Sequence, residues 1–422
     1  MKFLHAADLH IDSPLRGLER YEGAPVEHIR GATRRALEHL VELCLTEKVS
    51  LLVIAGDLYD GGWNDYSTGL FFCQQMARLN EGGVRVVWIR GNHDAASRLT
   101  QHLRPPENVT ELSHGRPSTL ELVLDGVDVA IHGQGFPKQR VTDDLSERYP
   151  APIPGAFNLG LLHTALDGRE GHDRYAPCRV EGLLNRGYDY WALGHVHRRE
   201  EVRRDPYIVF PGNLQGRHAR ETGPKGATLV TLQGNRVVEL EHRALDEVRW
   251  AHVTVDAARA ASADDVVDGV REQISAEVSE AEGKLLCVRV SVTGSTRAHS
   301  ALALDSERWQ NEVRAASLDV GRGAAWVEKV LLRTRPEGDV EALRARQDPV
   351  GALLRTLDAV RSDEVELGAL VEELSELRRK LPQELRDGPD AARIGDAAGV
   401  RALLDDIEGL LLPMLSDEGS DA

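Results

Sequence analysis

Buried strands that end in metal-binding side chains are the feature of this sequence that most constrains its fold. Apolar runs that are typical of strands occupy residues 2–7, 50–55, 84–89, 159–162 and 190–193. Each run leads into residue types that bind metals, and these residues are Asp8, His10, Asp57, Asn92, His163, His195 and His197. Strands of an open α/β sheet end at a common edge, so residues far apart in sequence can meet there. The pattern therefore predicts a single site at this edge.

The seven side chains form a mixed set of oxygen and nitrogen donors. Carboxylates, an amide and imidazoles suit two divalent cations better than thiolate-bound zinc or all-oxygen calcium. Asp57 follows a glycine at a central strand end, and we expect it to bridge the two ions. His93, next to Asn92, is expected to act on a substrate phosphate as a proton donor or charge stabiliser. Asp94 is expected to orient His93 through a hydrogen bond.

The chain is long enough for two or three domains, at 422 residues. Helical spacing of apolar residues predicts helices over 26–48 and 66–79, and Asp125-Gly126 predicts a type I′ hairpin turn. Residues 1–243 are predicted to form two sheets with flanking helices. Residues 244–335 are predicted to form a small α/β accessory domain, and residues 336–422 a helical, acidic tail with three leucine-rich stripes.

Net charge is distributed unevenly along the chain. Residues 1–243 carry 29 Lys and Arg against 32 Asp and Glu, a balance of −3. Residues 244–422 carry the other 22 against 36, a balance of −14. Divalent ions would make the cleft of the first part locally positive, whereas the acidic part is better suited to a protein partner or simply keeps the chain soluble. No basic stripe in the sequence marks a path for nucleic acid.

The sequence also gives expectations about the compartment. No apolar run approaches the roughly 18–20 residues that a membrane span needs, and no secretory signal precedes Asp8. Four scattered cysteines without a C-x-x-C pair are typical of reduced thiols. We therefore expect a cytoplasmic protein without a membrane partner.

The order D-x-H, G-D, G-N-H-D, lone His and G-H-x-H resembles the calcineurin-like metallophosphoesterases. Within them the chain looks like the SbcD/YhaO group of DNA repair exonucleases. This closer resemblance rests on His10-Ile-Asp12-Ser13-Pro14 with the residues up to Leu18, and on residues 211–226. It covers about residues 1–243. Asp12 departs from the pattern, because SbcD-type nucleases usually have a small residue there.

The resemblance implies a two-sheet metallophosphoesterase sandwich that uses two divalent ions, usually manganese, to cut DNA. It implies one metal on Asp8, His10, Asp57 and His197, a second on Asp57, Asn92, His163 and His195, and a catalytic His93. Members of this family commonly pair with a coiled-coil ATPase of the SMC type through helices that follow the nuclease domain. The sequence also leaves a homodimer open.

Several interpretations stay open at this point. Residues 212–226 are rich in glycine and carry Arg217, His218 and Arg220, which could cradle a phosphate or could form an ordinary loop. The leucine stripes of the tail could bind a partner or pack on one another. The enzyme could also hydrolyse small-molecule or protein phosphoesters, because the core motif is shared across such substrates. The remaining alternative is a binding subunit with a vestigial site. The complete set of candidate ligands in this sequence speaks against it.

Overall fold

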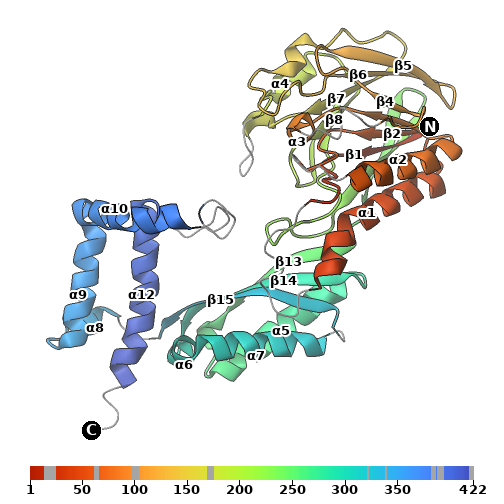
Figure 1. The fold of residues 1–422 in the computed structure, drawn as a ribbon. Coiled ribbons are helices and arrows are strands. Elements are labelled where there is room, and N and C mark those ends of the chain that lie inside the picture. Colours follow the sequence, from red (N-terminus) through yellow and green to blue (C-terminus); the bar gives the residue numbers. More distant parts are fainter. Residues whose placement is uncertain are drawn as a thin grey trace. The chain divides into compact units, whose positions relative to one another are not determined.

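The structure is a computed structural model (Figure 1). It describes residues 1–13, 25–60, 66–96, 104–168, 175–320, 323–337, 340–381, 386 and 394–417. Residues 14–18 of the motif that contains Asp12 lie outside these ranges. The chain forms two compact units, one of residues 1–251 with 283–287 and the other of residues 252–282 with 288–422. The division at residues 243 and 335 remains a prediction.

The first unit contains two six-stranded sheets. The first sheet has the order β12-β11-β1-β2-β3-β4, with β1 to β4 parallel and β11 antiparallel to β1 and β12. Its strands are β1 (Lys2–Ala6), β2 (Leu51–Ile54), β3 (Arg85–Trp88), β4 (Val109–Glu111), β11 (Gly226–Gln233) and β12 (Arg236–Ala244). The short β4 was not predicted.

The second sheet has the order β5-β6-β7-β8-β10-β9, and β6, β7, β8 and β10 run parallel. Its strands are β5 (Ser118–Leu124), β6 (Val127–Gly133), β7 (Phe157–His163), β8 (Tyr190–Gly194), β9 (Glu200–Arg204) and β10 (Tyr207–Phe210). The predicted hairpin of β5 and β6 is confirmed, and its turn has φ of 49° at Asp125 and 76° at Gly126. Positive φ at both positions is what a type I′ turn requires.

Core packing explains why the strands at the centre are apolar throughout. Phe3 and Val53 of the first sheet share one buried cluster with Leu159 of the second sheet. Their neighbours Leu4 and Leu52 pack on the opposite side, in a cluster with α1 (Val26–Thr46) and α2 (Tyr66–Glu81). Successive side chains of a strand face opposite sides, so a sheet covered on both faces needs continuous apolar runs. The predicted α/β sandwich with flanking helices is confirmed.

Short helical segments complete the first unit: α3 (Asn92–Ala96), α4 (Val180–Leu184), and the 3₁₀ turns Leu145–Arg148 and Leu166–Gly168. A third cluster, around Phe136, Leu162 and Trp191, is buried on the outer side of the second sheet.

A three-stranded sheet of order β13-β14-β15 follows. It consists of β13 (Val248–Asp256), β14 (Leu285–Thr296) and β15 (Ala325–Pro336). A 3₁₀ turn (Ala257–Arg259), α5 (Ala263–Glu280), α6 (His299–Leu304) and α7 (Ser306–Asp319) accompany it, and the last two were not predicted. Ser262 and Asp265 form a capping box that fixes the start of α5.

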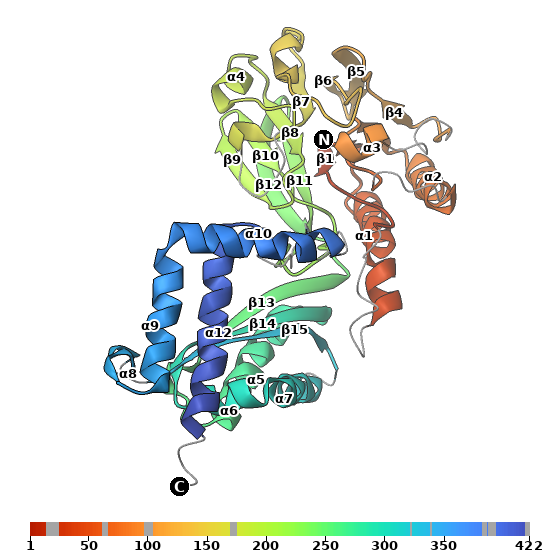
Figure 2. The same ribbon diagram turned by 60° about the vertical axis from the view of Figure 1, so that its left-hand side comes forward.

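The C-terminal helices bury the predicted leucine stripes against one another. They are α8 (Val340–Ala345), α9 (Pro349–Ser362), α10 (Glu364–Lys380) and α12 (Ala397–Asp417). Leu357, Leu367, Val400 and Leu404 form their small core. Helices α9 and α12 run side by side, and α10 lies across their ends (Figure 2). Among the helices of the described ranges, none is both long and apolar enough to cross a membrane.

Candidate metal centre

The loops after five strands meet at the carboxyl edges of the two sheets. Asp8 follows β1, Asp57 follows β2 and Asn92 begins α3 after β3, whereas His163 ends β7 and His195 follows β8. Backbone hydrogen bonds hold the first two loops together, from Asp8 N to Gly56 O and from His10 N to Asp57 O, both 3.0 Å long. Parallel pairing therefore aligns the predicted residues within each sheet, and the packing of the two sheets brings both sets to one place.

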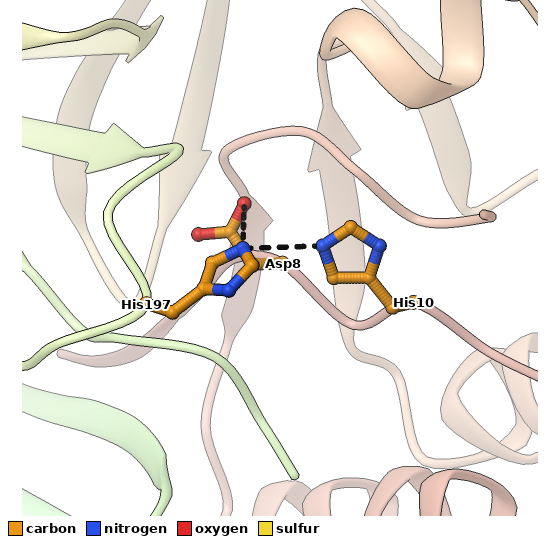
Figure 3. A group of neighbouring side chains, drawn as sticks. All are labelled: Asp8, His10 and His197. Carbon is orange, nitrogen blue, oxygen red and sulfur yellow. Dashed lines mark hydrogen bonds and ion pairs between the residues drawn. The ribbon is translucent and has the colours of Figure 1, made fainter. Parts of the chain in front are cut away.

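One group of candidate ligands comprises Asp8, His10 and His197, whose donor atoms all lie within 4.8 Å of one another. Figure 3 shows these side chains pointing toward one another from the β1 loop and the loop after β8. His10 Nε2 lies 3.3 Å from His197 Nε2, which is 4.0 Å from Asp8 Oδ1.

A second group comprises Asp8, Asp57 and His163 and satisfies the same 4.8 Å limit. Asp57 Oδ2 lies 3.5 Å from His163 Nε2 and 3.8 Å from His10 Nε2. Asp57 therefore lies between the two groups, and its side chain is buried.

The hydrogen bonds of His163 indicate what the site can hold. Its Nδ1 lies 2.9 Å from the carbonyl oxygen of Ala55, which can only accept, so Nδ1 carries the proton. In the neutral ring Nε2 is then an acceptor, yet it faces Asn92 Oδ1 at 2.9 Å. A cation bound by both atoms would satisfy this arrangement, as would the flipped amide, in which Asn92 Nδ2 donates to His163 Nε2.

His197 repeats this arrangement in the first group. Its Nδ1 lies 2.6 Å from Glu221 Oε1, and a carboxylate at this distance keeps the proton on Nδ1. The lone pair of His197 Nε2 is thereby directed toward Asp8 and His10. Glu221 accepts further hydrogen bonds from Asn213 Nδ2 and the backbone N–H of Arg217, at 2.9 and 2.8 Å.

Burial makes the carboxylates of the site costly without a cation. Burial, together with the charge of Asp57, raises the pKa of Asp8 well above its ordinary value. Burial also raises the pKa of Asp57, to about 6, although His93 opposes the shift. Bound divalent cations would offset these charges, and the oxygen and imidazole donors fit such cations.

Four residues of the site have a left-handed backbone conformation. The φ angle is 52° at Asp8, 44° at His10, 53° at Asp57 and 97° at His195. A left-handed conformation costs a residue with a side chain roughly 1–3 kcal/mol, and it recurs at active sites as well as in tight turns such as the one at Asp125. Here it turns these side chains toward the site.

His195 contributes through its backbone as well as its ring. Its N–H donates to both carboxylate oxygens of Asp8, at 3.1 and 3.0 Å. Its ring lies edge-on to the rings of His163 and Tyr175, with centroids 5.1 and 5.7 Å apart.

The partner of His93 differs from the predicted one. His93 Nδ1 lies 2.7 Å from Asp60 Oδ1, whereas Asp94 accepts hydrogen bonds from the backbone N–H groups of Gly91 and Tyr59, at 2.9 and 3.0 Å. Asp94 is fully buried and holds two ligand-bearing loops together. Asp60, not Asp94, thus occupies the position of a residue that orients His93. Asp60 follows Asp57 by three residues in Gly56-Asp57-Leu58-Tyr59-Asp60, a spacing that sequence reasoning overlooked.

Of the three residues predicted to bind substrate, only Arg217 points into the centre. Its guanidinium lies 3.2 Å from both His197 Nδ1 and Glu221 Oε1, and 3.8 Å from Asp60 Oδ2. His218 Nε2 lies 3.7 Å from Glu221 Oε1, and Arg220 is exposed. Arg217 is therefore engaged by protein carboxylates, which the sequence did not reveal because Asp60 is distant in the chain and Glu221 carried no motif of its own.

Together the sandwich of two sheets and the cluster of aspartate, asparagine and histidine at its edge define a metallophosphoesterase. The family model of the calcineurin-like phosphoesterases matches residues 1–199, and that of the middle domain of the metallophosphoesterase YhaO matches residues 250–335. The chain belongs to the calcineurin-like phosphoesterase family.

Two relatives are similar over much of the chain. The uncharacterized metallophosphoesterase YhaO of Bacillus subtilis is 33% identical over 297 residues, which are 70% of this chain and 72% of YhaO. The DNA double-strand break repair protein Mre11 of Methanopyrus kandleri is 27% identical over 283 residues, 60% of this chain and 58% of Mre11. Among solved structures, TT1561 of Thermus thermophilus is 14% identical, with a TM-score of 0.34 over 57% of this chain and 98% of TT1561. A score this low supports no conclusion about function.

Proposed function

We propose that this metallophosphoesterase is a DNA exonuclease that uses two divalent ions, with manganese as the physiological metal. The observation that carries the proposal is the meeting of two ligand groups around Asp57, with His93 at their side. The similarity to an Mre11, a protein named for DNA double-strand break repair, directs the proposal toward DNA.

In this proposal Asp8, His10, Asp57 and His197 hold one ion, and Asp57, Asn92, His163 and His195 hold the other. Two ions so placed would supply positive charge to the phosphoryl oxygens and acidify the attacking water. The position of Asp57 Oδ2 between His10 and His163 is the one a bridging carboxylate needs.

His93 is proposed to donate a proton to the oxygen that leaves. Burial alone would lower the pKa of His93, but the hydrogen bond to Asp60 and the charge of Asp57 outweigh burial and raise it. The His93 side chain is 35% exposed, so it can reach a substrate at the mouth of the site. Asp60 is proposed to fix its orientation, as carboxylates commonly do for functional histidines.

A basic loop beside the site supports a polyanionic substrate. Residues 137–140 are exposed between the buried anchors Phe136 and Val141, and they include Lys138 and Arg140. The Phe136 ring lies edge-on to that of His163, with centroids 5.4 Å apart, and Val141 O accepts from Ala176 N at 2.8 Å. In the described part of the chain, neither basic side chain forms an ion pair. Both are thus available to backbone phosphates next to the metal centre.

We further propose that the protein acts in the cytoplasm beside a coiled-coil ATPase of the SMC type. Four free cysteines suit a reducing compartment. Val365 and Leu377 on α10 are 82% and 52% exposed, which leaves apolar surface for a partner helix. A homodimer could use the same surface.

The decisive experiment is manganese-dependent degradation of end-labelled duplex DNA, run beside the Asn92→Ala protein and with bis-p-nitrophenyl phosphate as a second substrate. We expect both activities in the wild-type chain and neither in the variant. Hydrolysis of the small diester with intact DNA would favour a phosphoesterase for small-molecule or protein substrates. Loss of neither activity in Asn92→Ala would overturn the metal assignment. No activity and no bound metal in the wild type would favour the vestigial binding subunit.

A further inference from the structure

A cleft lies in the compact unit that residues 252–282 and 288–422 form. It has a volume of about 970 Å³ and is bounded by β15, by α6 and the start of α7, and by α12, with Arg344 of α8 and Arg361 of α9 also lining it. This volume is at the upper end of the roughly 300–1,000 Å³ of small-ligand pockets. His299 of α6 connects β15 with α12, since its Nδ1 lies 2.9 Å from Thr334 Oγ1 and its Nε2 lies 2.8 Å from Gly409 O.

Strand β15 contributes its edge to this cleft. Seven consecutive residues, 330–336, line the cleft. Successive side chains of a strand face opposite sides, so a cleft on one face of the sheet would be lined by only every second residue. An unbroken run of lining residues therefore indicates that the edge of the strand forms the wall. Strand β15 is the last in its sheet, and no described strand pairs with its outer side. A cleft wall of this kind presents backbone hydrogen-bonding groups as well as side chains.

The outward-facing backbone groups can be assigned from one hydrogen bond. Glu337 N–H donates to Thr296 O of β14 at 3.3 Å, so residue 337 faces inward. Alternation along the strand then directs the N–H and C=O groups of Val330, Leu332 and Thr334 outward. The backbone of Pro336 faces outward by the same alternation. This agrees with its being a proline, because proline is tolerated in a sheet where the missing N–H would have faced solvent.

Unpaired charges of both signs line the cleft. Arg333 and Arg335 are exposed on β15, and neither makes an ion pair with any residue in the described ranges. Across the cleft on α12, Asp406 is likewise without an ion pair there, whereas Asp405 is bound to Arg361 at 3.1 Å. Leu302 and Leu332 add apolar surface between the charges. A segment that complements these groups carries mainly acidic side chains beside β15 and a basic one toward α12.

We propose that this cleft binds an extended acidic segment of a partner protein by adding it as a strand to β15. Main-chain hydrogen bonds from Leu332 and Thr334 would hold the segment, while Arg333 and Arg335 select its carboxylates. A compact small molecule would leave the row of outward backbone groups without partners, which is why we favour an extended chain.

The test measures fluorescence anisotropy of a labelled nine-residue peptide, Thr-Val-Glu-Val-Glu-Val-Thr-Val-Lys, with the full chain. We expect saturable binding that Arg333→Glu with Arg335→Glu weakens about tenfold or more, the equivalent of one lost charged hydrogen bond. Leu332→Pro removes an outward N–H without touching the ladder to β14, and Leu332→Ala removes the same side chain but keeps the N–H. We expect Leu332→Pro to bind at least about tenfold more weakly than Leu332→Ala.

A peptide N-methylated at alternate residues gives the same comparison without altering the protein, in case Leu332→Pro does not fold. Two such peptides are compared, one methylated at its odd-numbered residues and one at its even-numbered residues. We expect one of them not to bind, because it lacks the N–H groups that face β15, and the other to bind as before. Absence of saturable binding at 1 mM peptide would overturn the proposal. Equal binding by Leu332→Pro and Leu332→Ala, or by both methylated peptides, would overturn strand addition. None of these outcomes depends on nuclease activity.

Discussion

His93 Nδ1 lies 2.7 Å from Asp60 Oδ1, and Asp60 is also held by Ser13 Oγ at 2.5 Å. Burial by itself would raise the pKa of Asp60, but hydrogen bonds and charge from His10 and His93 outweigh burial and keep the pKa well below its usual range. Asp60 is therefore ionised when His93 is protonated. This pair joins the mouth of the site to the loop that carries Asp57.

The pair predicts distinct effects of two similar substitutions. Asp60→Asn should lower kcat roughly 10–100-fold, because the side chain that orients His93, and that lies 3.7 Å from His10 Nδ1, loses its charge. Asp94→Asn should mainly lower the free energy of unfolding, because Asp94 accepts backbone hydrogen bonds from Gly91 and Tyr59. Diester kinetics, metal content and urea unfolding of both variants check this. A larger loss of kcat in Asp94→Asn than in Asp60→Asn would return the orienting role to Asp94.

Metal removal should lower stability as well as activity. A cation that binds only the folded chain adds about 2.7 kcal/mol to its stability at a concentration of 100 times Kd. We therefore expect manganese to raise the Tm of the EDTA-treated protein, and Asn92→Ala to reduce this rise because Asn92 Oδ1 faces His163 Nε2. Asn235→Ala, in the turn between β11 and β12, is the matched control and should keep the full rise. An unchanged manganese shift in Asn92→Ala would remove Asn92 from the ligand set.

The basic loop predicts a change in the salt dependence of DNA binding. Each phosphate contact contributes a slope of about −0.9 to log K against log salt on duplex DNA. Replacing Lys138 and Arg140 together by alanine should therefore reduce the slope by about 2 in magnitude. Hydrolysis of bis-p-nitrophenyl phosphate should be unchanged.

Arg236→Ala is the control for this experiment. Arg236 pairs with Gln233 at the turn where β11 and β12 meet, near the amino end of β1 and thus at the sheet edge opposite the metal centre. An equal loss of slope in the control and the double variant would mean that the loop does not track the DNA.

Folding stability should depend on pH through His5, which links the sheets. Its Nδ1 lies 3.1 Å from Tyr190 Oη and its Nε2 3.1 Å from Leu193 O. Burial lowers the pKa of His5 from 6.5 to about 3. The unfolded chain therefore takes up a proton that the folded chain does not, so this stability is complete above pH 6.5 and is lost as pH falls toward 3.

At pH 5 the loss should be about 2 kcal/mol relative to pH 7, from roughly 1.36 kcal/mol per pH unit below 6.5. Glutamine does not titrate, so the free energy of unfolding of His5→Gln should fall by about 2 kcal/mol less than that of the wild type between pH 7 and pH 5. This difference does not depend on the stability of the variant at pH 7. Urea unfolding of both proteins at pH 7 and pH 5 gives the comparison. Parallel losses in the two proteins would contradict a neutral, buried His5.

The strands that position the site could be predicted because they are apolar on both faces. The runs at residues 50–55 and 190–193 became β2 and β8 with ends displaced by only one residue. Short or half-exposed elements were missed, such as β4 with three half-buried residues and β9 with two exposed arginines. Such segments lack the periodicity that a buried face imposes.

Sequence alone determined the types of the candidate ligands, their order and their place at strand ends, because a buried parallel strand and the loop after it each leave a local pattern. Only the tertiary structure decided which charges meet: Asp60 with His93, Glu221 with His197, and Arg217 between these two carboxylates. These pairs join loops from different strands and both sheets. The distances between them depend on how the sandwich packs, and residue spacing along the chain carries no record of that packing.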